Sequence, residues 1–371
     1  MGALTWLVAL LLAAVTLRRC IYLLASLLAP RVHQPSRRFS VAVLASFKNE
    51  AFAAPHLLDS LAALDYPGSR ISFTLMSDGS SDRTPELLTS WAAGRPNASV
   101  LIGPVSEGKS VALNRALAAA PPSDLVAIYD ADTRPAATHL ASLAGAFEDP
   151  RVAAASGLLL PANAAQSVVA RYAALETWVY QTVILAGKDR CGANPPVVGS
   201  NCLYRRLDLE AAGGFPPGSF SEDIELSFAF TARGLRTRWI RGAQAHVLVV
   251  STLGRFWRQR TRWTSGLYLS SSRARGLEAW LTATGYADRL ILVAGLLLIW
   301  FGRLHPVWVA AYFAAILCGT LAALLRAHDP GPRWAYVFVA PPMFVIDVAA
   351  SVWSTLLHVV GRRVEWRTER A

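Results

Sequence analysis

Apolar segments at both ends of the chain constrain its fold more than any other feature. The first 17 residues, MGALTWLVALLLAAVTL, carry no charge, and three further apolar segments occupy 290–302, 306–325 and 334–360. A membrane-spanning helix needs about 20 mostly apolar residues. Hydrophobic residues make up 53% of the chain, and their excess lies in these end segments. The sequence therefore predicts a membrane protein with a soluble middle.

A secretory signal peptide is the alternative for the N-terminal segment, but such a peptide carries positive charge before its apolar run. Here Arg18, Arg19, Arg31, Arg37 and Arg38 all follow the run. The pattern predicts a helix that crosses the membrane once. Because positive charge concentrates on the cytoplasmic side, it also places the start of the chain outside and the large middle segment in the cytoplasm.

The three C-terminal apolar segments leave the topology open. If all three cross, the basic tail lies outside, against the charge rule; if the short segment 290–302 lies in the interface or re-enters, the tail returns to the cytoplasm. The second arrangement is favoured. Asp347, within the last segment, indicates either a polar path or a satisfied residue at a helix kink after Pro341 and Pro342.

The net charge of +11 does not indicate a nucleic-acid-binding protein, because Lys and Arg are spread over loops and membrane edges without a basic and aromatic platform. Anionic lipid headgroups and an anionic substrate explain it better. The cysteines show no metal-ligand spacing and are expected to be free thiols, and the seven histidines are expected to be structural. The four cysteines are Cys20, Cys191, Cys202 and Cys318.

The middle of the chain alternates between strand and helix patterns. Strands are predicted within 39–47, 71–82, 98–103 and 124–132, and helices within 53–64, 84–93 and 109–120. This alternation predicts an α/β fold with a mostly parallel sheet and helical crossovers. In such sheets, ligands bind beyond the carboxyl ends of the strands. Polar residues follow three of these strands and predict a nucleotide-sized crevice: Asn49, Glu50, Asp78, Asp130 and Asp132.

Two acids stand one residue apart in the stretch AIYDADTRP, at Asp130 and Asp132. Residues i and i+2 of an extended backbone project to the same side, so both carboxylates can address one ligand. Two oxygen donors suit Mg²⁺ or Mn²⁺ shared with a diphosphate, where the ion stabilises charge on a leaving group. A D-x-D pair alone is also common in turns and helix caps, so the prediction depends on its place after a buried strand.

Two further elements lie downstream. Glu222 and Asp223 begin an amphipathic helix pattern, where a carboxylate serves either as a general base or as a plain N-terminal cap. In RFWRQRTRWTSGL, Gln259, Arg262 and Trp263 share one helix face that carries an amide, a guanidinium and an indole. Such a face suits a diphosphate and a sugar. Read alone, it is most simply a basic interfacial helix beside a membrane, with Trp at the level of the headgroups.

The series KNE, SDGSSDRT, EGK…LNRA, DAD, GSN…RR, SED and QRTRW, in this order, resembles the family-two GT-A glycosyltransferases. The most similar group is the membrane-bound branch with the Q-x-x-R-W signature, which includes cellulose, chitin and hyaluronan synthases and ceramide and other lipid glucosyltransferases. The resemblance covers about residues 39–275, and the tail VEWRTER looks like the basic closing segment of that family. It implies an anchor at 1–38, a cytoplasmic GT-A domain at 39–275, and interfacial and transmembrane helices with a basic tail at 276–371.

The resemblance also implies roles for matching residues. Asp78 would hold the base or ribose of a nucleotide, helped by Asn49, Glu50 and Lys109. Asp130 and Asp132 would hold the diphosphate, with Asp132 on the metal.

Asp223, with Glu222 beside it, would be the base that deprotonates the acceptor. Gln259, Arg262 and Trp263 would close over the diphosphate and frame the acceptor, near the GSN turn. That turn comprises Gly199, Ser200 and Asn201. Ser221 stands where the family more often has Thr, and both hydroxyls can cap a helix.

These features together predict a metal-dependent, inverting glycosyltransferase at the cytoplasmic face of the cell membrane. A lipid acceptor is favoured because polysaccharide synthases need a channel built from more spanning helices. A processive synthase and a non-catalytic membrane scaffold remain the alternatives. The motifs do not distinguish UDP-glucose, UDP-galactose, UDP-N-acetylglucosamine and GDP-mannose, although the resemblance favours a UDP-sugar.

Overall fold

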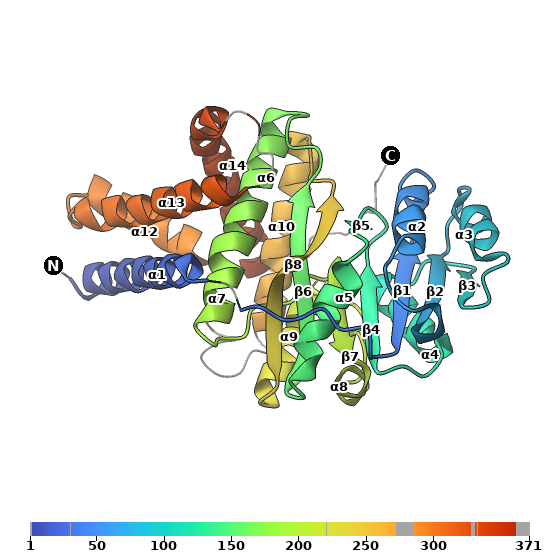
Figure 1. Cartoon of the computed structure of the whole chain (residues 1–371). Helices are drawn as coiled ribbons and strands as arrows, with labels where there is room; N and C mark the ends of the chain where they lie inside the picture. The colour runs from blue at the N-terminus through green and yellow to red at the C-terminus, as the bar shows by residue number, and fades with distance from the viewer. Residues whose placement is uncertain are drawn as a thin grey trace. The chain divides into compact units, whose positions relative to one another are not determined.

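The structure is a computed structural model of the whole chain (Figure 1). The described residues are 2–29, 31–219, 221–271, 285, 287–327, 331 and 333–360. They form two compact units. The sheet unit comprises 31–162 and 194–248, and the helical unit comprises the described residues within 2–29, 163–193 and 249–360.

The sheet unit is built on eight strands in the order β3-β2-β1-β4-β7-β6-β8-β5. The strands are β1 (Val41–Phe47), β2 (Ile71–Asp78), β3 (Ala98–Gly103), β4 (Leu125–Tyr129), β5 (Arg134–Pro135), β6 (Val152–Pro161), β7 (Asn201–Arg205) and β8 (Arg236–Val247). Four pairings are parallel, namely β1 with β2, β1 with β4, β2 with β3 and β6 with β8. The strand β7 is antiparallel to both β4 and β6. The predicted α/β fold with a mostly parallel sheet is therefore confirmed.

Helices cover both faces of this sheet, as the two hydrophobic clusters of the unit demonstrate. The helices are α2 (Ala54–Ala62), α3 (Thr84–Ala92), α4 (Lys109–Ala119), α5 (His139–Ala144), α8 (Arg206–Ala211) and α9 (Glu222–Ala232), with short 3-10 turns η1 (Gly68–Arg70) and η2 (Gly145–Glu148). Val43 of β1 packs in the cluster with α2 and α5, and its neighbour Leu44 packs in the cluster with α4 and α9. Successive side chains of a strand point to opposite faces. A strand covered on both faces must be apolar throughout, which explains the continuous run VAVLASF.

The helical unit contains eight helical segments. These are α1 (Ala3–Leu27), α6 (Val168–Val179), the π-helical turn η3 (Tyr180–Leu185), α7 (Ala186–Arg190), α10 (Leu253–Ser271), α12 (Ala287–Trp300), α13 (Val307–Arg326) and α14 (Trp334–Val359). Leu12 of α1 packs with Leu292 of α12 and Tyr312 of α13. Trp178 of α6 packs with Leu324 of α13 and Tyr336 of α14. The unit therefore has its own apolar core.

Among the described residues, three helices are long and apolar enough to cross a membrane: α1, α13 and α14. Helix α12, which covers most of the short segment 290–302, has 14 residues, fewer than the roughly 20 that a span needs. Helix α14 continues through Pro341 and Pro342. The basic tail and part of the segment that begins at 276 lie outside the described residues.

Candidate active site

The carboxyl ends of three neighbouring strands lie at one edge of the sheet. Asp78 is the last residue of β2, and Asp130 follows β4 directly. Because β1 pairs in parallel with both β2 and β4, Asn49 and Glu50, just beyond β1, lie at the same edge. This is the edge where open α/β sheets bind ligands.

Hydrogen bonds tie the turn after β1 to the turn after β2. The N–H of Asn49 donates to Ser80 Oγ (3.0 Å), and the N–H of Ser81 donates to Asn49 Oδ1 (2.8 Å). The N–H of Glu50 donates to Thr84 Oγ1 (2.9 Å). Asn49 has a φ of 52°, in the left-handed region that asparagine tolerates better than most residues. Its side chain therefore organises the loops, and its contact with a nucleotide stays a prediction.

The buried carboxylate of Asp78 holds the segment that leads into α4. Its Oδ2 accepts from Ser106 Oγ (2.7 Å) and from the N–H of Gly108 (3.0 Å), and its Oδ1 accepts from the N–H of Glu107 (2.9 Å). This role of Asp78 was not predicted from the sequence, although Ser106 and Gly108 before a helix indicate a tight approach. The predicted role of Asp78 in holding base or ribose is untested by these contacts.

Gly79 allows the segment before α4 to lie close to the turn that follows β2. Its φ is +59°, and a Cβ there would lie 2.4 Å from the backbone nitrogen of Ser106.

We expect Gly79→Ala to displace this segment, to weaken nucleotide binding and to lower the melting temperature. Gly94→Ala is the matched control, because Gly94 has a φ of +77° but open space around its Cβ position. Left-handed alanine costs about 1–2 kcal/mol, and the clash adds about 1–3 kcal/mol. Equal melting temperatures for the two variants would show that the contact imposes no constraint.

Lys109, the first residue of α4, joins two of the predicted acids. Its Nζ lies 2.8 Å from Asp130 Oδ1 and 2.8 Å from Glu222 Oε1. Burial alone would lower the pKa of Lys109, but Asp130 and Glu222 hold it well above its ordinary value. The lysine is therefore a fixed positive charge at the edge of the sheet, between the D-x-D pair and the start of α9.

Asp223 lies beside the GSN turn. Its Oδ2 accepts from the N–H of Gly199 (2.8 Å), and its Oδ1 accepts from the N–H of Ile224 (2.9 Å). A Cβ on Gly199 would lie 3.0 Å from Asp223 Oδ2, so glycine suits this contact. Burial, followed by the like charge of Glu222, raises the pKa of Asp223 to about 6, against the opposing effect of Lys109. Asp223 thus combines a defined orientation with a pKa suited to proton transfer near neutral pH.

The GSN turn also contacts the D-x-D turn. The N–H of Asp130 donates to the carbonyl oxygen of Ser200 (3.3 Å), and Asn201 is fully buried at the start of β7. Asp223, Gly199 and Ser200 therefore connect α9 to the end of β4. The sheet unit thus brings together most of the predicted residues that lie within it.

The D-x-D pair has the donor set that a hard divalent cation takes. Asp130 is 31% exposed at its side chain, and Asp132 is half-buried. The strand β4 ends at Tyr129, and the N–H of Thr133 donates to the carbonyl oxygen of Asp130 (2.9 Å). The pair therefore lies in a turn and not in the extended backbone that the sequence predicted. Carboxylate oxygens fit Mg²⁺ or Mn²⁺, which keep waters and share themselves with phosphates.

The three remaining residues lie on α10, in the helical unit. Gln259, Arg262 and Trp263 are half-buried, whereas Arg260 and Thr264 are buried. The helical repeat places these two groups on different sides of α10. The predicted Gln-Arg-Trp face is therefore present on one helix, and its approach to the D-x-D pair stays a prediction.

The doubly covered sheet, with carboxylates at the ends of its parallel strands, has the architecture of a glycosyltransferase of the GT-A type. The chain belongs to the glycosyltransferases described as "Glycosyl transferase family group 2", whose family model matches residues 125–346. The members of this family are glycosyltransferases, and the chain shares their family model over more than half of its length.

Relatives and a solved structure agree with this membership. The chain is 29% identical over 230 residues to the probable glycosyltransferase YdaM of Bacillus subtilis (strain 168), covering 61% of this chain and 54% of that protein. It is 26% identical over 248 residues to the beta-monoglucosyldiacylglycerol synthase of Trichormus variabilis (strain ATCC 29413 / PCC 7937), covering 64% and 52%. The matches thus span about half the length of these relatives.

The solved structure is the mannosyltransferase PcManGT from Pyrobaculum calidifontis, in complex with GDP-Man and Mn²⁺. It superposes with a TM-score of 0.67 at 21% identity, covering 96% of this chain and 99% of that one. The GT-A fold predicted from the sequence is confirmed.

Proposed function

We propose that the protein is an inverting, metal-dependent glycosyltransferase that transfers a sugar from a UDP-sugar to a membrane lipid at the cytoplasmic face of the cell membrane. The observation that carries the proposal is the cluster of Lys109, Asp130, Glu222 and Asp223 at the carboxyl ends of the strands. The contacts of Lys109 with Asp130 and Glu222, and the raised pKa of Asp223, support roles as a fixed cation, a metal ligand and a general base.

In the proposed reaction, Asp223 takes the proton from the acceptor hydroxyl. The hydroxyl oxygen forms a bond to the anomeric carbon, on the face opposite to the nucleotide, so the configuration inverts. The bond between that carbon and the β-phosphate oxygen breaks, and its electron pair leaves on the nucleoside diphosphate. Positive charge from Lys109 stabilises that oxygen. A divalent ion on Asp130 and Asp132 would supply further charge neutralisation for the leaving group.

Three observations support a lipid acceptor. The helices α1, α13 and α14 are long and apolar enough to bring the enzyme to a bilayer. Three candidate spans, the number found in the described part of the chain, are few for a polysaccharide channel. A relative with 26% identity is named for synthesis of a glucosyl diacylglycerol.

The arginines that follow α1 favour the cytoplasmic side for the sheet unit.

The acidic limb of the pH profile tests the assignment of Asp223. A general base acts in its deprotonated form, so kcat/KM should fall as pH drops below about 6, the raised pKa of Asp223. Replacing Glu222 by Gln removes a like charge, so the pKa of Asp223 falls and the limb moves to lower pH. Glu225→Gln, in the same first turn of α9, is the control and should leave the limb in place. A limb that stays fixed in Glu222→Gln would contradict the assignment.

Nucleotide release by the purified protein in native-lipid nanodiscs tests the function as a whole. UDP-glucose, UDP-galactose, UDP-N-acetylglucosamine and GDP-mannose are each supplied with Mg²⁺ or Mn²⁺, and the lipid fraction is examined by mass spectrometry. We expect one lipid to gain one or two sugars. A long water-soluble glycan ladder would indicate a processive synthase instead. Absence of metal-dependent nucleotide binding would favour a non-catalytic scaffold.

A further inference from the structure

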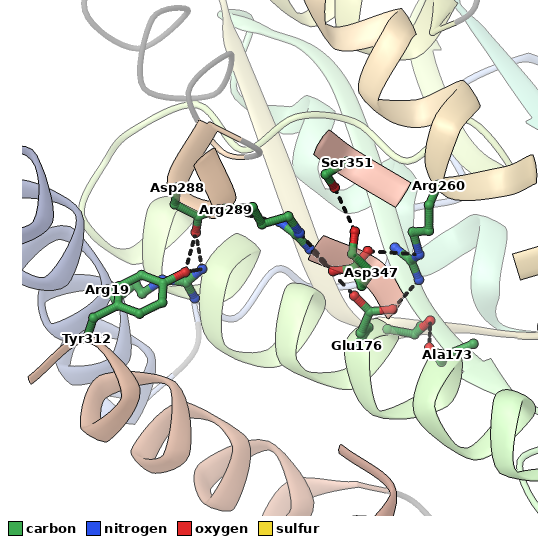
Figure 2. A network of polar contacts seen from close by, with 10 residues as sticks. Arg19, Ala173, Glu176, Arg260, Asp288, Arg289, Tyr312, Asp347 and Ser351 are labelled. Atoms are coloured by element: carbon green, nitrogen blue, oxygen red, sulfur yellow. Dashed lines mark hydrogen bonds and ion pairs between the residues drawn. The ribbon is translucent and has the colours of Figure 1, made fainter. Parts of the chain in front are cut away.

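A chain of alternating charges runs through the helical unit (Figure 2). In order, its members are Arg19, Asp288, Arg289, Asp347, Arg260 and Glu176. They come from α1, α12, α14, α10 and α6, and their three positive and three negative charges balance. Buried charges need partners, because an unpaired ion in a protein interior is strongly destabilising.

Asp347 lies at the centre of this chain and is fully buried in α14. The Nε of Arg289 donates to its Oδ2 (2.8 Å), and the Nε of Arg260 lies 3.6 Å from its Oδ1. These contacts pair the charge of Asp347 and favour a structural role over a polar path, although its buried Oδ1 accepts no hydrogen bond from the described residues. The carboxylate joins α12 and α10 to α14.

Arg260 is the point at which the chain of charges reaches α10. Its Nη2 forms an ion pair with Glu176 of α6, and only 3% of the residue is exposed. Its guanidinium carbon lies 4.6 Å from the ring centroid of Phe256 and 4.7 Å from that of Trp263. The guanidinium therefore packs against one aromatic ring from the preceding turn of α10 and one from the following turn. It also forms ion pairs with carboxylates of two other helices.

A second contact holds the same helix. Ser354 Oγ of α14 donates to the carbonyl oxygen of Thr261 (3.0 Å) and lies 2.9 Å from Ser265 Oγ. One side of α10 is thus anchored by Arg260, Thr261 and Ser265, and the other side carries Gln259 and Arg262. Trp263 belongs to the Gln-Arg-Trp face, and its ring packs against the Arg260 guanidinium of the anchored side.

We propose that Arg260 is a positioning residue for sugar transfer: by binding Glu176 and Asp347 and packing against Trp263, it fixes α10 so that the Gln-Arg-Trp face is held for catalysis. This inference rests on the proposed function. Arginine suits the task because its planar fork binds two carboxylates and packs on aromatic rings together, which lysine cannot reproduce.

The test removes this anchor without leaving a buried charge unpaired. The double variant Arg260→Met with Glu176→Gln deletes one positive and one negative group, and Arg289 still neutralises Asp347. Replacing a buried ion pair by neutral groups is often tolerated. We expect a melting temperature close to that of the wild type and kcat for transfer at least tenfold lower, measured as lipid glycosylation in nanodiscs.

The matched control removes the ion pair at the other end of the chain of charges. Arg19→Met with Asp288→Asn deletes a pair between α1 and α12 that does not touch α10. We expect its kcat per folded protein to stay within twofold of the wild type. Equal losses in the two double variants would indicate general weakening of the helical unit and would overturn the proposal.

A disulfide distinguishes positioning from any other role of Arg260. Ser265→Cys with Ser354→Cys places two thiols where hydroxyls are 2.9 Å apart, so a crosslink would hold α10 on α14 without Arg260. In the Arg260→Met, Glu176→Gln background, the oxidised protein should regain most of its kcat and lose it again on reduction, with the crosslink verified by mass spectrometry. The inference would be overturned if the crosslink forms and kcat does not recover. It would also be overturned if the uncrosslinked variant transfers sugar within twofold of the wild-type rate. Neither outcome would contradict the proposed function. Wild-type protein that is silent with every donor would instead contradict the proposed function.

Discussion

Asp223→Asn is expected to reduce sugar transfer by about 10²–10⁴-fold, the usual contribution of a positioned general base. Asparagine keeps the size of the side chain and one oxygen that can accept from the N–H of Gly199 or Ile224, as the aspartate does. It cannot accept a proton from an acceptor hydroxyl. We therefore expect transfer to collapse while nucleotide affinity, measured by calorimetry, stays within a few-fold of the wild type.

Asp208→Asn is the matched control for this substitution. Asp208 lies in the first turn of α8, as Asp223 lies in the first turn of α9, and its carboxylate is 3.7 Å from the guanidinium of Arg205. The control removes a carboxylate at a helix start without touching the GSN turn. Transfer at the wild-type rate in Asp223→Asn would eliminate Asp223 as the base. Equal losses in both variants would point to helix capping instead.

Asp132→Asn is expected to weaken metal-dependent nucleotide binding by at least tenfold, which corresponds to about 1.4 kcal/mol. The substitution replaces a charged oxygen donor by a neutral amide, and Mg²⁺ and Mn²⁺ prefer carboxylate oxygens. Transfer should fall at least as much, because the same ion would neutralise the leaving group. Calorimetric titration of UDP with and without Mn²⁺ measures the effect.

Asp124→Asn provides the control at the opposite end of the same strand. Asp124 precedes β4, and its carboxylate accepts from Ser40 rather than facing the site. Binding of UDP in the presence of Mn²⁺ should be unchanged there. Unchanged Mn²⁺-dependent binding in Asp132→Asn would remove Asp132 from the metal site and leave Asp130 as the acid to test.

The first half of the sheet unit could be predicted because its signals are local. Buried strands such as β1 read as continuous apolar runs, and the helices between them show their own periodicity. The strands β6, β7 and β8 were not predicted. Their pairings mix parallel and antiparallel partners, with register shifts between β6 and β8. These strands pair with segments more than 30 residues away. The sequence pattern of one strand does not indicate which distant segment it pairs with.

In the candidate site, too, local features could be predicted and contacts between distant residues could not. Asp78, Asp130 and Asp223 could be selected because they stand at strand ends or a helix start. Their tasks could not all be assigned. Asp78 holds the segment before α4, and Lys109 joins Asp130 to a residue more than 100 positions away. No spacing rule relates such distant residues.

The sequence by itself determined the apolar ends, the alternating strands and helices of the first half, and the carboxylates that mark a glycosyltransferase. The tertiary structure alone decided which charges meet. Arg260 reads as one arginine among several in RFWRQRTRW, yet it is the one that lies between Glu176 and Asp347. The physical reason is that amphipathic periodicity depends on neighbours within a few turns, whereas the partner of a buried charge is set by which helices pack together.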